Sequence, residues 1–142
     1  MENKEKGFAR VVMQSPPVNS VNLELLQRLN EVIKDLEEKK FRGLILTSGI
    51  PKIFSGGIDL KEIYNPSMER FEILLKAFLT CWKTLYITPL RTVVAVNGHA
   101  AGAGCMIVLS CDHSAMVKSK GSIGFPENRL GFAAPKWYEI NT

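Results

Sequence analysis

The stretch Thr92-Val93-Val94-Ala95-Val96-Asn97-Gly98-His99-Ala100-Ala101-Gly102-Ala103-Gly104-Cys105 joins an apolar run to a glycine-rich loop. Residues 92–96 predict a strand covered on both faces, and residues 103–110 predict a helix. The small residues between them let the backbone approach a ligand, and the first N–H groups of the helix can stabilise a phosphate or an oxyanion. Close packing of a helix on a sheet explains the same small residues. From this stretch alone, both interpretations stay open.

Strands and helices alternate along the rest of the chain. Apolar runs at 8–13, 43–47 and 114–117 predict further strands. Apolar residues at steps of three and four predict helices over 22–38 and 67–86. This order is typical of an α/β domain with a largely parallel sheet, in which ligands bind beyond the carboxyl ends of strands. The loops predicted at 48–58 and 97–105 follow such strands.

Composition narrows the class of protein. The chain has 142 residues, 46% of them hydrophobic and 23% charged, which is usual for one soluble globular domain. A net charge of +4, scattered along the chain, predicts no nucleic-acid partner. The apolar segment 93–109 contains polar residues and glycines, so we expect no membrane span. The 97–105 loop matches neither nucleotide-binding glycine pattern.

Cysteines and histidines give no evidence of a metal site. Cys81, Cys105 and Cys111 lack the spacing of zinc ligands, and we expect buried, reduced thiols. His99 and His113 have no serine, cysteine or metal-ligand partner at useful spacing, so we expect a turn residue and a structural residue respectively.

Four motifs follow one another along the chain, and their order indicates a protein family more strongly than any one of them alone. They are Phe54-Ser55-Gly56-Gly57-Ile58-Asp59-Leu60, Val96-Asn97-Gly98, Cys111-Asp112 and Pro126-Glu127-Asn128-Arg129-Leu130-Gly131. The set resembles the crotonase (enoyl-CoA hydratase/isomerase) superfamily over nearly the whole chain, and residues 16–20 and 130–137 look most like the mitochondrial Δ3,Δ2-enoyl-CoA isomerases. The resemblance implies an α/β fold of the crotonase (ClpP-like) spiral ββα type. Because family members are longer, it also implies that residues 1–142 are the N-terminal part of one domain, incomplete at its C-terminus.

The resemblance also assigns site residues. Two backbone amides, those of Ile58 and Ala103, would form an oxyanion hole for a thioester carbonyl, although the family usually has glycine at position 103. The substrate-binding residues implied are those of the two glycine loops: Phe54, Ser55, Gly56, Gly57, Gly102 and Gly104. The loop 54–56 would lie against the CoA moiety.

Glu127 is the residue that the resemblance implies for proton transfer. A carboxylate in an apolar pocket has a raised pKa and can act as a base and then as an acid near neutral pH. The sequence around Glu127 is apolar, with Ile123, Phe125, Leu130 and Phe132. Without the resemblance, a glutamate that caps a turn after Pro126 would be the better interpretation.

Met106 favours one chemistry over another. Crotonase-type hydratases carry a second glutamate where this chain has Met106. Water addition needs one group to orient the water and another to supply the proton, whereas a 1,3-proton shift needs one carboxylate. We therefore expect isomerisation of 3-enoyl-CoA to trans-2-enoyl-CoA in unsaturated fatty acid β-oxidation, with acyl-CoA as substrate and neither cofactor nor metal. The alternatives are a truncated, inactive protein that binds acyl-CoA or a partner and, third, an enoyl-CoA hydratase.

Assembly and location are likewise implied by the resemblance. Full-length family members form homo-trimers through C-terminal helices, which lie beyond the part of the domain expected here. The family also implies the mitochondrial matrix, although residues 1–6, Met-Glu-Asn-Lys-Glu-Lys, are not typical of a targeting segment. The preferred acyl-chain length is not predicted by the sequence.

Overall fold

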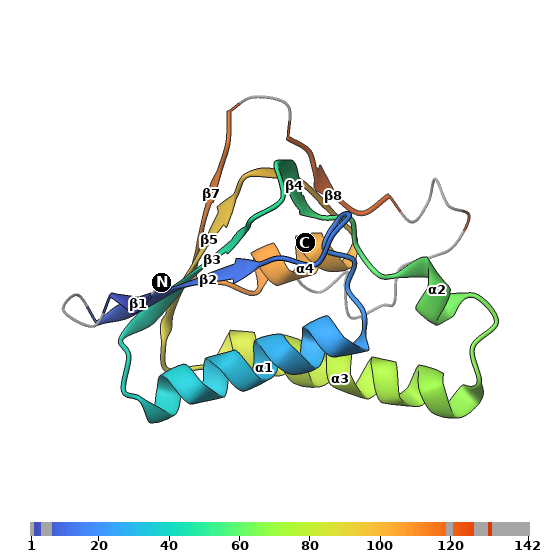
Figure 1. The fold of residues 1–142 in the computed structure, drawn as a ribbon, viewed down its shortest axis with the longest axis horizontal. Helices are drawn as coiled ribbons and strands as arrows, with labels where there is room; N and C mark the ends of the chain where they lie inside the picture. Colours follow the sequence, from blue (N-terminus) through green and yellow to red (C-terminus); the bar gives the residue numbers. More distant parts are fainter. Residues whose placement is uncertain (1, 4–6, 119–120, 127–130, 132–142) are drawn as a thin grey trace.

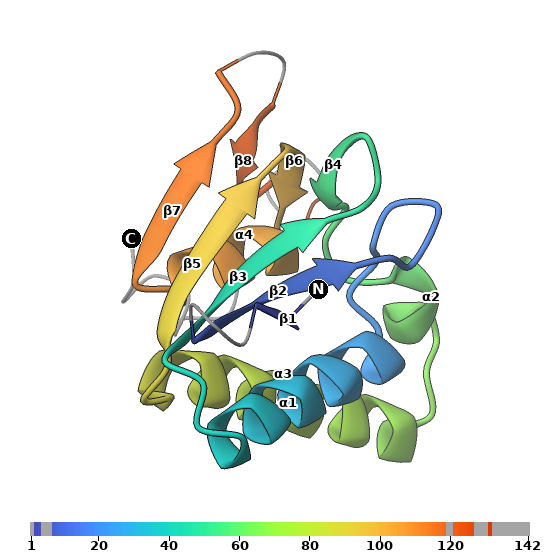
Figure 2. The ribbon, with the colours of Figure 1, turned by 60° about the vertical axis from the view of Figure 1, so that its left-hand side comes forward.

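The computed structural model describes residues 2–3, 7–118, 121–126 and 131. Five strands form one sheet, here called the large sheet, in the order β1-β2-β3-β5-β7. They are β1 (Glu2–Asn3), β2 (Phe8–Met13), β3 (Gly43–Ser48), β5 (Arg91–Val96) and β7 (His113–Met116). Only the pairing of β1 with β2 is antiparallel. Figure 2 shows β2, β3, β5 and β7 running side by side in the same direction.

Three short strands form a second, small sheet in the order β4-β6-β8. They are β4 (Lys52–Ser55), β6 (Gly98–Ala101) and β8 (Ile123–Gly124), all parallel. Each follows a strand of the large sheet along the chain, so the chain passes from the large sheet to the small one three times. This arrangement agrees with the spiral ββα fold. The predicted loops at 48–58 and 97–105 are therefore not wholly loops, because they contain β4 and β6.

Four helices complete the described fold: α1 (Leu23–Glu38), α2 (Leu60–Ile63), α3 (Met68–Ile87) and α4 (Ala103–Leu109). α1 and α3 lie side by side under the large sheet (Figure 1). Both start where the sequence predicts. The Asn22 side chain accepts the Leu25 N–H at 2.9 Å, and Ser67 accepts the Arg70 N–H at 3.2 Å. α2 was not predicted.

Apolar side chains of both sheets and of α1, α3 and α4 form one core. Its fully buried members include Leu26, Ile33, Leu44, Leu46, Phe54, Leu74, Val94, Val96 and Met106. The apolar faces predicted for the two long helices supply Leu26, Leu29, Ile33, Leu74, Phe78 and Leu85. The core thus holds α4 against β4 and β6, where the two glycine loops lie.

Candidate active site

The first glycine loop is fixed against the segment that precedes α1. The Gly56 N–H donates to Val18 O at 2.8 Å. Gly57 O accepts the Val21 N–H at 2.7 Å, and the Asp59 N–H donates to Val21 O at 3.0 Å, which forms an isolated bridge between Val21 and Ile58. Because the C=O and N–H of a trans peptide point in opposite directions, the Ile58 N–H points away from Val21.

A buried polar cluster around Asn19 seats this loop on the large sheet. The Asn19 side chain donates to Ser48 Oγ at 2.8 Å and to Phe54 O at 3.0 Å. Ser55 Oγ donates to Asn19 O at 2.8 Å and accepts the Gly57 N–H at 3.2 Å. Asn19 lies within the stretch 16–20 that contributes to the family resemblance, and its role here depends on long-range contacts that no local pattern reveals.

The second glycine loop leads from β6 into α4. Gly102 caps the helix with φ of 49°, a conformation that glycine adopts without strain. Gly102 O accepts the Met106 N–H at 3.0 Å. The Ala103 N–H, on the opposite side of that peptide, therefore points out of the helix.

The fold brings these two amides together. A Cβ placed on Gly57, whose φ is +91°, would lie 2.9 Å from Ala101 O and 3.8 Å from the Ala103 nitrogen. One placed on Gly104 would lie 2.6 Å from Ser55 Cβ, so α4 packs closely on the end of β4. Within the described part of the chain, neither the Ile58 nor the Ala103 N–H donates to a protein acceptor. Two free donors on adjacent loops can share one oxygen.

A cavity of about 330 Å³ adjoins the second loop. Its described lining has no ionisable side chain and comprises Ala100, Ala101, Ser122, Ile123, Gly124, Phe125 and Pro126. The Gly102 N–H donates to Gly124 O at 2.9 Å, which fixes this wall to the loop. Glu127 follows Pro126 directly in the chain but lies outside the described residues.

The other predicted site residues fall into two groups. Phe54 and Ser55 are fully buried, Phe54 in the core and Ser55 in the Asn19 cluster, so their side chains are structural. Gly56 is exposed and is the residue of loop 54–56 that a ligand can reach. Gly57, Gly102 and Gly104 shape the two loops through their backbones, as described above. Met106 is 1% exposed and belongs to the core.

Within the described residues, the thiols and histidines form no catalytic arrangement. Cys81, Cys105 and Cys111 are free thiols, and the predicted burial holds for Cys81 and Cys105, whereas Cys111 is half-buried. Burial raises the pKa of Cys81 and of Cys111 to about 12, so neither is a thiolate nucleophile near neutral pH. His99 lies in β6 rather than in a turn, with Nδ1 2.7 Å from Ser122 Oγ. Over the described ranges, no three His, Cys, Asp or Glu side chains gather as a metal site would need.

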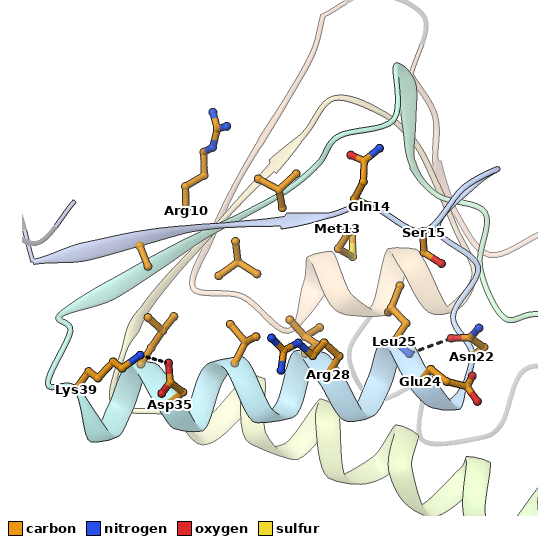
Figure 3. A pocket seen from close by; sticks show the side chains of 16 residues that line it. Arg10, Met13, Gln14, Ser15, Asn22, Glu24, Leu25, Arg28, Asp35 and Lys39 are labelled. Carbon is orange, nitrogen blue, oxygen red and sulfur yellow. Dashed lines mark hydrogen bonds and ion pairs between the residues drawn. The ribbon is translucent and has the colours of Figure 1, made fainter. Parts of the chain in front are cut away.

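A second cavity, of about 680 Å³, lies between β2 and α1 (Figure 3). Val11, Leu25 and Val32 line it, and charged side chains stand at its rim, where Lys39 pairs with Asp35 at 2.8 Å. None of the predicted site residues that the structure describes lines this cavity. The candidate active site is therefore the pair of backbone amides of Ile58 and Ala103, and not this second cavity. Among the described helices, none has the length and apolar character needed to cross a bilayer.

Comparisons with known proteins agree with this fold. Residues 3–140 match the enoyl-CoA hydratase/isomerase family. The chain is 40% identical over 139 residues to the mitochondrial enoyl-CoA delta isomerase 1 of Rattus norvegicus, covering 96% of this chain and 48% of the relative. It is 29% identical over 129 residues to a probable enoyl-CoA hydratase of Mycobacterium leprae, covering 88% of this chain and 49% of the relative.

Among solved structures, human mitochondrial delta3-delta2-enoyl-CoA isomerase superposes with a TM-score of 0.93 at 37% identity, covering 99% of this chain and 55% of that one. The chain spans about half the length of the curated relatives it matches. The crotonase fold expected from the sequence is confirmed. On this fold, these motifs and the match over residues 3–140, the chain belongs to the enoyl-CoA hydratase/isomerase family.

Proposed function

We propose that this chain carries the oxyanion hole of a Δ3,Δ2-enoyl-CoA isomerase, which converts 3-enoyl-CoA to trans-2-enoyl-CoA in unsaturated fatty acid β-oxidation. The observation that carries the proposal is the convergence of two free backbone donors, those of Ile58 and Ala103, from adjacent loops. The similarity to the rat and human isomerases supports the same reaction.

In this proposal the carbonyl oxygen of the thioester accepts one hydrogen bond from the Ile58 N–H and one from the Ala103 N–H. Removal of a proton from C2 converts the thioester to an enolate, whose negative charge develops on that oxygen, so the fixed donors stabilise the enolate more than the substrate. The double bond moves from C3–C4 to C2–C3 when a proton returns to C4. No electron acceptor, water or metal enters this balance, and the proposal therefore needs no cofactor.

Glu127 is the proposed catalytic base and acid, taking the proton from C2 and returning it to C4. The apolar lining that ends at Pro126 supports this role, because a carboxylate with few polar neighbours holds a proton more readily. Met106 supports isomerase over hydratase, since its buried thioether supplies no second carboxylate. Gly56 is the proposed contact of the first loop with the CoA moiety.

Two further expectations concern location and assembly, and the names of the relatives support the first. The rat, mouse and human isomerases are named as mitochondrial proteins, and we propose the same compartment for this chain. As family members, the full-length proteins are expected to form homo-trimers, and we propose that any trimer here depends on sequence beyond the half that this chain matches.

Ala103→Pro tests the oxyanion hole. Proline removes the N–H, yet its ring fits the first position of a helix, where that N–H has no intrahelical partner. We expect kcat for 3-enoyl-CoA to fall about 100- to 1000-fold. Met68→Pro is the matched control, because Met68 holds the same position in α3 and is 72% exposed. Full activity of Ala103→Pro with a native melting temperature would contradict the proposal.

Glu127→Gln separates the proposed activity from its alternatives. An isomerase loses turnover in this variant and keeps acyl-CoA binding. If the unmodified chain binds acyl-CoA and has no turnover, it is an inactive binding protein, an alternative motivated by its match to half of each relative. Hydration of trans-2-enoyl-CoA by the unmodified chain would identify a hydratase instead.

A further inference from the structure

An ion pair lies beside the segment that carries Ile58. Arg70 of α3 donates through Nε to Glu62 Oε2 at 2.9 Å and through Nη2 to Glu62 Oε1 at 2.6 Å. The Glu62 side chain is 11% exposed and belongs to α2. A two-pronged contact between a guanidinium and a carboxylate fixes orientation as well as distance. The pair therefore ties α2 to the start of α3.

The ion pair also reaches a third helix. In addition to the hydrogen bond from Arg70, the backbone N–H of Leu23, the first residue of α1, helps to lower the pKa of Glu62. Arg70 Nη2 lies 3.4 Å from Glu24 Oε1, on the next residue of α1. Leu23 is two residues beyond Val21, which bridges Ile58. The segment from Gly57 to Glu62 is thus held at its start by the hydrogen bonds to Val21 and at its end by the contact of Glu62 with Arg70.

Among the residues that the structure describes, little else anchors α2. None of its four residues is fully buried, and Leu60 is 57% exposed. Ile63 is partly buried against the core, and Asp59 caps the helix by accepting the Lys61 N–H at 3.0 Å. The cap lies within the segment itself and does not attach it to its surroundings. The bonds from Glu62 supply that attachment.

We propose that Glu62 and Arg70 are positioning residues that keep the Ile58 N–H aimed at the oxygen shared with Ala103. The inference rests on the proposed oxyanion hole. Ile58 lies four residues before Glu62, and movement of α2 would turn the peptide between Gly57 and Ile58. A displacement of about 1 Å in a catalytic donor can lower a rate about 100-fold, so an ion pair that never touches substrate can still influence turnover.

Hydrogen exchange tests this role independently of activity. The Asp59 N–H, which bonds to Val21 O, reports on the Ile58 segment, and the Gly49 N–H, which bonds to Met13 O at 2.9 Å, reports on the rest of the fold. In Arg70→Ala and Glu62→Gln we expect the Asp59 amide to exchange about tenfold faster, with Gly49 unchanged. Arg28→Ala is the matched control, since Arg28 pairs with Glu31 on the exposed face of α1.

Kinetics then separate positioning from simple stabilisation. We expect Arg70→Ala to lower kcat about tenfold while KM changes less than about twofold. Arg70→Lys should recover part of the loss, because lysine keeps the charge without the two-pronged contact. Unchanged Asp59 exchange in both variants, or equally faster exchange at Asp59 and Gly49, would overturn the inference. If the unmodified chain shows no isomerase activity, the proposed function fails, and the exchange data still decide whether the pair holds this segment.

Discussion

The large and small sheets differ in the residues that build them. In the large sheet, Leu46, Val94 and Val96 are at most 2% exposed and supply the core. The small sheet has three short strands in which Gly98, Ala100 and Gly124 leave little side chain to pack. Apolar burial thus dominates the first sheet, whereas in the second, apart from Phe54, close approach of backbones is the main feature. Because the second sheet adjoins the loops with the amides of Ile58 and Ala103, most of the stability and the geometry of the site depend on different parts of the fold.

Gly98 shows how close this approach is. A Cβ on Gly98 would collide with the backbone carbonyl of Lys52 and the nitrogen of Ile53, which belong to the paired strand β4. Backbone atoms in a paired strand cannot move aside as the end of a long side chain can. Glycine is therefore required where β6 leaves the large sheet.

The largest expected effect on stability is in the large sheet. Leu46→Ala should lower the free energy of unfolding by about 2–5 kcal/mol, because Leu46 is 0% exposed and its truncation leaves a cavity. Urea unfolding measures the change, and Val12→Ala, at a 37% exposed position of the same sheet, is the control. Turnover per folded molecule should stay the same. A loss of turnover without a loss of stability would break the comparison.

A smaller effect on stability is expected for Gly98→Ala, about 1–3 kcal/mol. We expect this variant to change the geometry of the site more than the stability of the fold. To admit the methyl group, β4 and β6 must separate, and the two loops move with them. Urea unfolding and titration with an acyl-CoA measure the two effects. Gly49→Ala is the control, because its methyl group would meet side chains rather than backbone: the flexible end of Gln14 and, at 3.3 Å, Val12 Cγ1. If Gly98→Ala binds acyl-CoA normally, the small sheet does not set the geometry of the loops.

The smallest expected effect is the loss of stability at low pH that comes from protonation of Glu62. The hydrogen bond from Arg70 lowers the pKa of Glu62 below its ordinary 4.5, aided by the Leu23 N–H and the Arg70 charge, while burial opposes the shift. A carboxyl whose pKa is lower in the folded state stabilises the fold fully above about pH 4.5, and this contribution is lost as pH falls through the folded-state pKa.

Hydrogen exchange between pH 3 and pH 6, an interval of roughly three units around the ordinary glutamate pKa, measures this effect. The Asp59 amide should lose protection at a higher pH than the Leu46 amide of the large sheet, after correction for intrinsic exchange. Glu62→Gln should remove this pH-dependent difference. If the Asp59 amide loses protection at the same pH in the unmodified chain and in Glu62→Gln, carboxyl groups other than Glu62 are responsible.

The strands of the large sheet, apart from β1, and the long helices were predictable from local sequence. The apolar run 92–96 predicts β5, although the expected cover on both faces is wrong for the described part of the chain: Thr92, Val94 and Val96 are buried on one face, while Val93 and Ala95 on the other are only partly buried. Asn22 and Ser67 mark helix starts by accepting N–H groups within the next three residues. These signals lie within a few residues of the structure that they specify. Composition and local pattern were sufficient there.

The small sheet and the Asn19 cluster could not be predicted in this way. β4 and β6 are strands because each pairs with the other across more than forty residues of chain, and Gly98 or Ala101 has no strand propensity of its own. The amides of Ile58 and Ala103 were named only through the resemblance, since a backbone donor has no side-chain signature. The structure supplies their convergence, while the role of Glu127 stays a prediction because it lies outside the described residues.

The positive φ of Gly57 has a consequence for reading variation at this site. Both proposed donors are main-chain atoms, so Ile58 and Ala103 can exchange side chains while the hydrogen-bonding chemistry persists. Gly57 cannot, because any Cβ there would be strained and would press on Ala101 O at 2.9 Å. A survey that scores only acidic, basic or nucleophilic residues would therefore overlook this site. At this site the residue that sequence variation must preserve is a glycine, Gly57, which has no side chain at all.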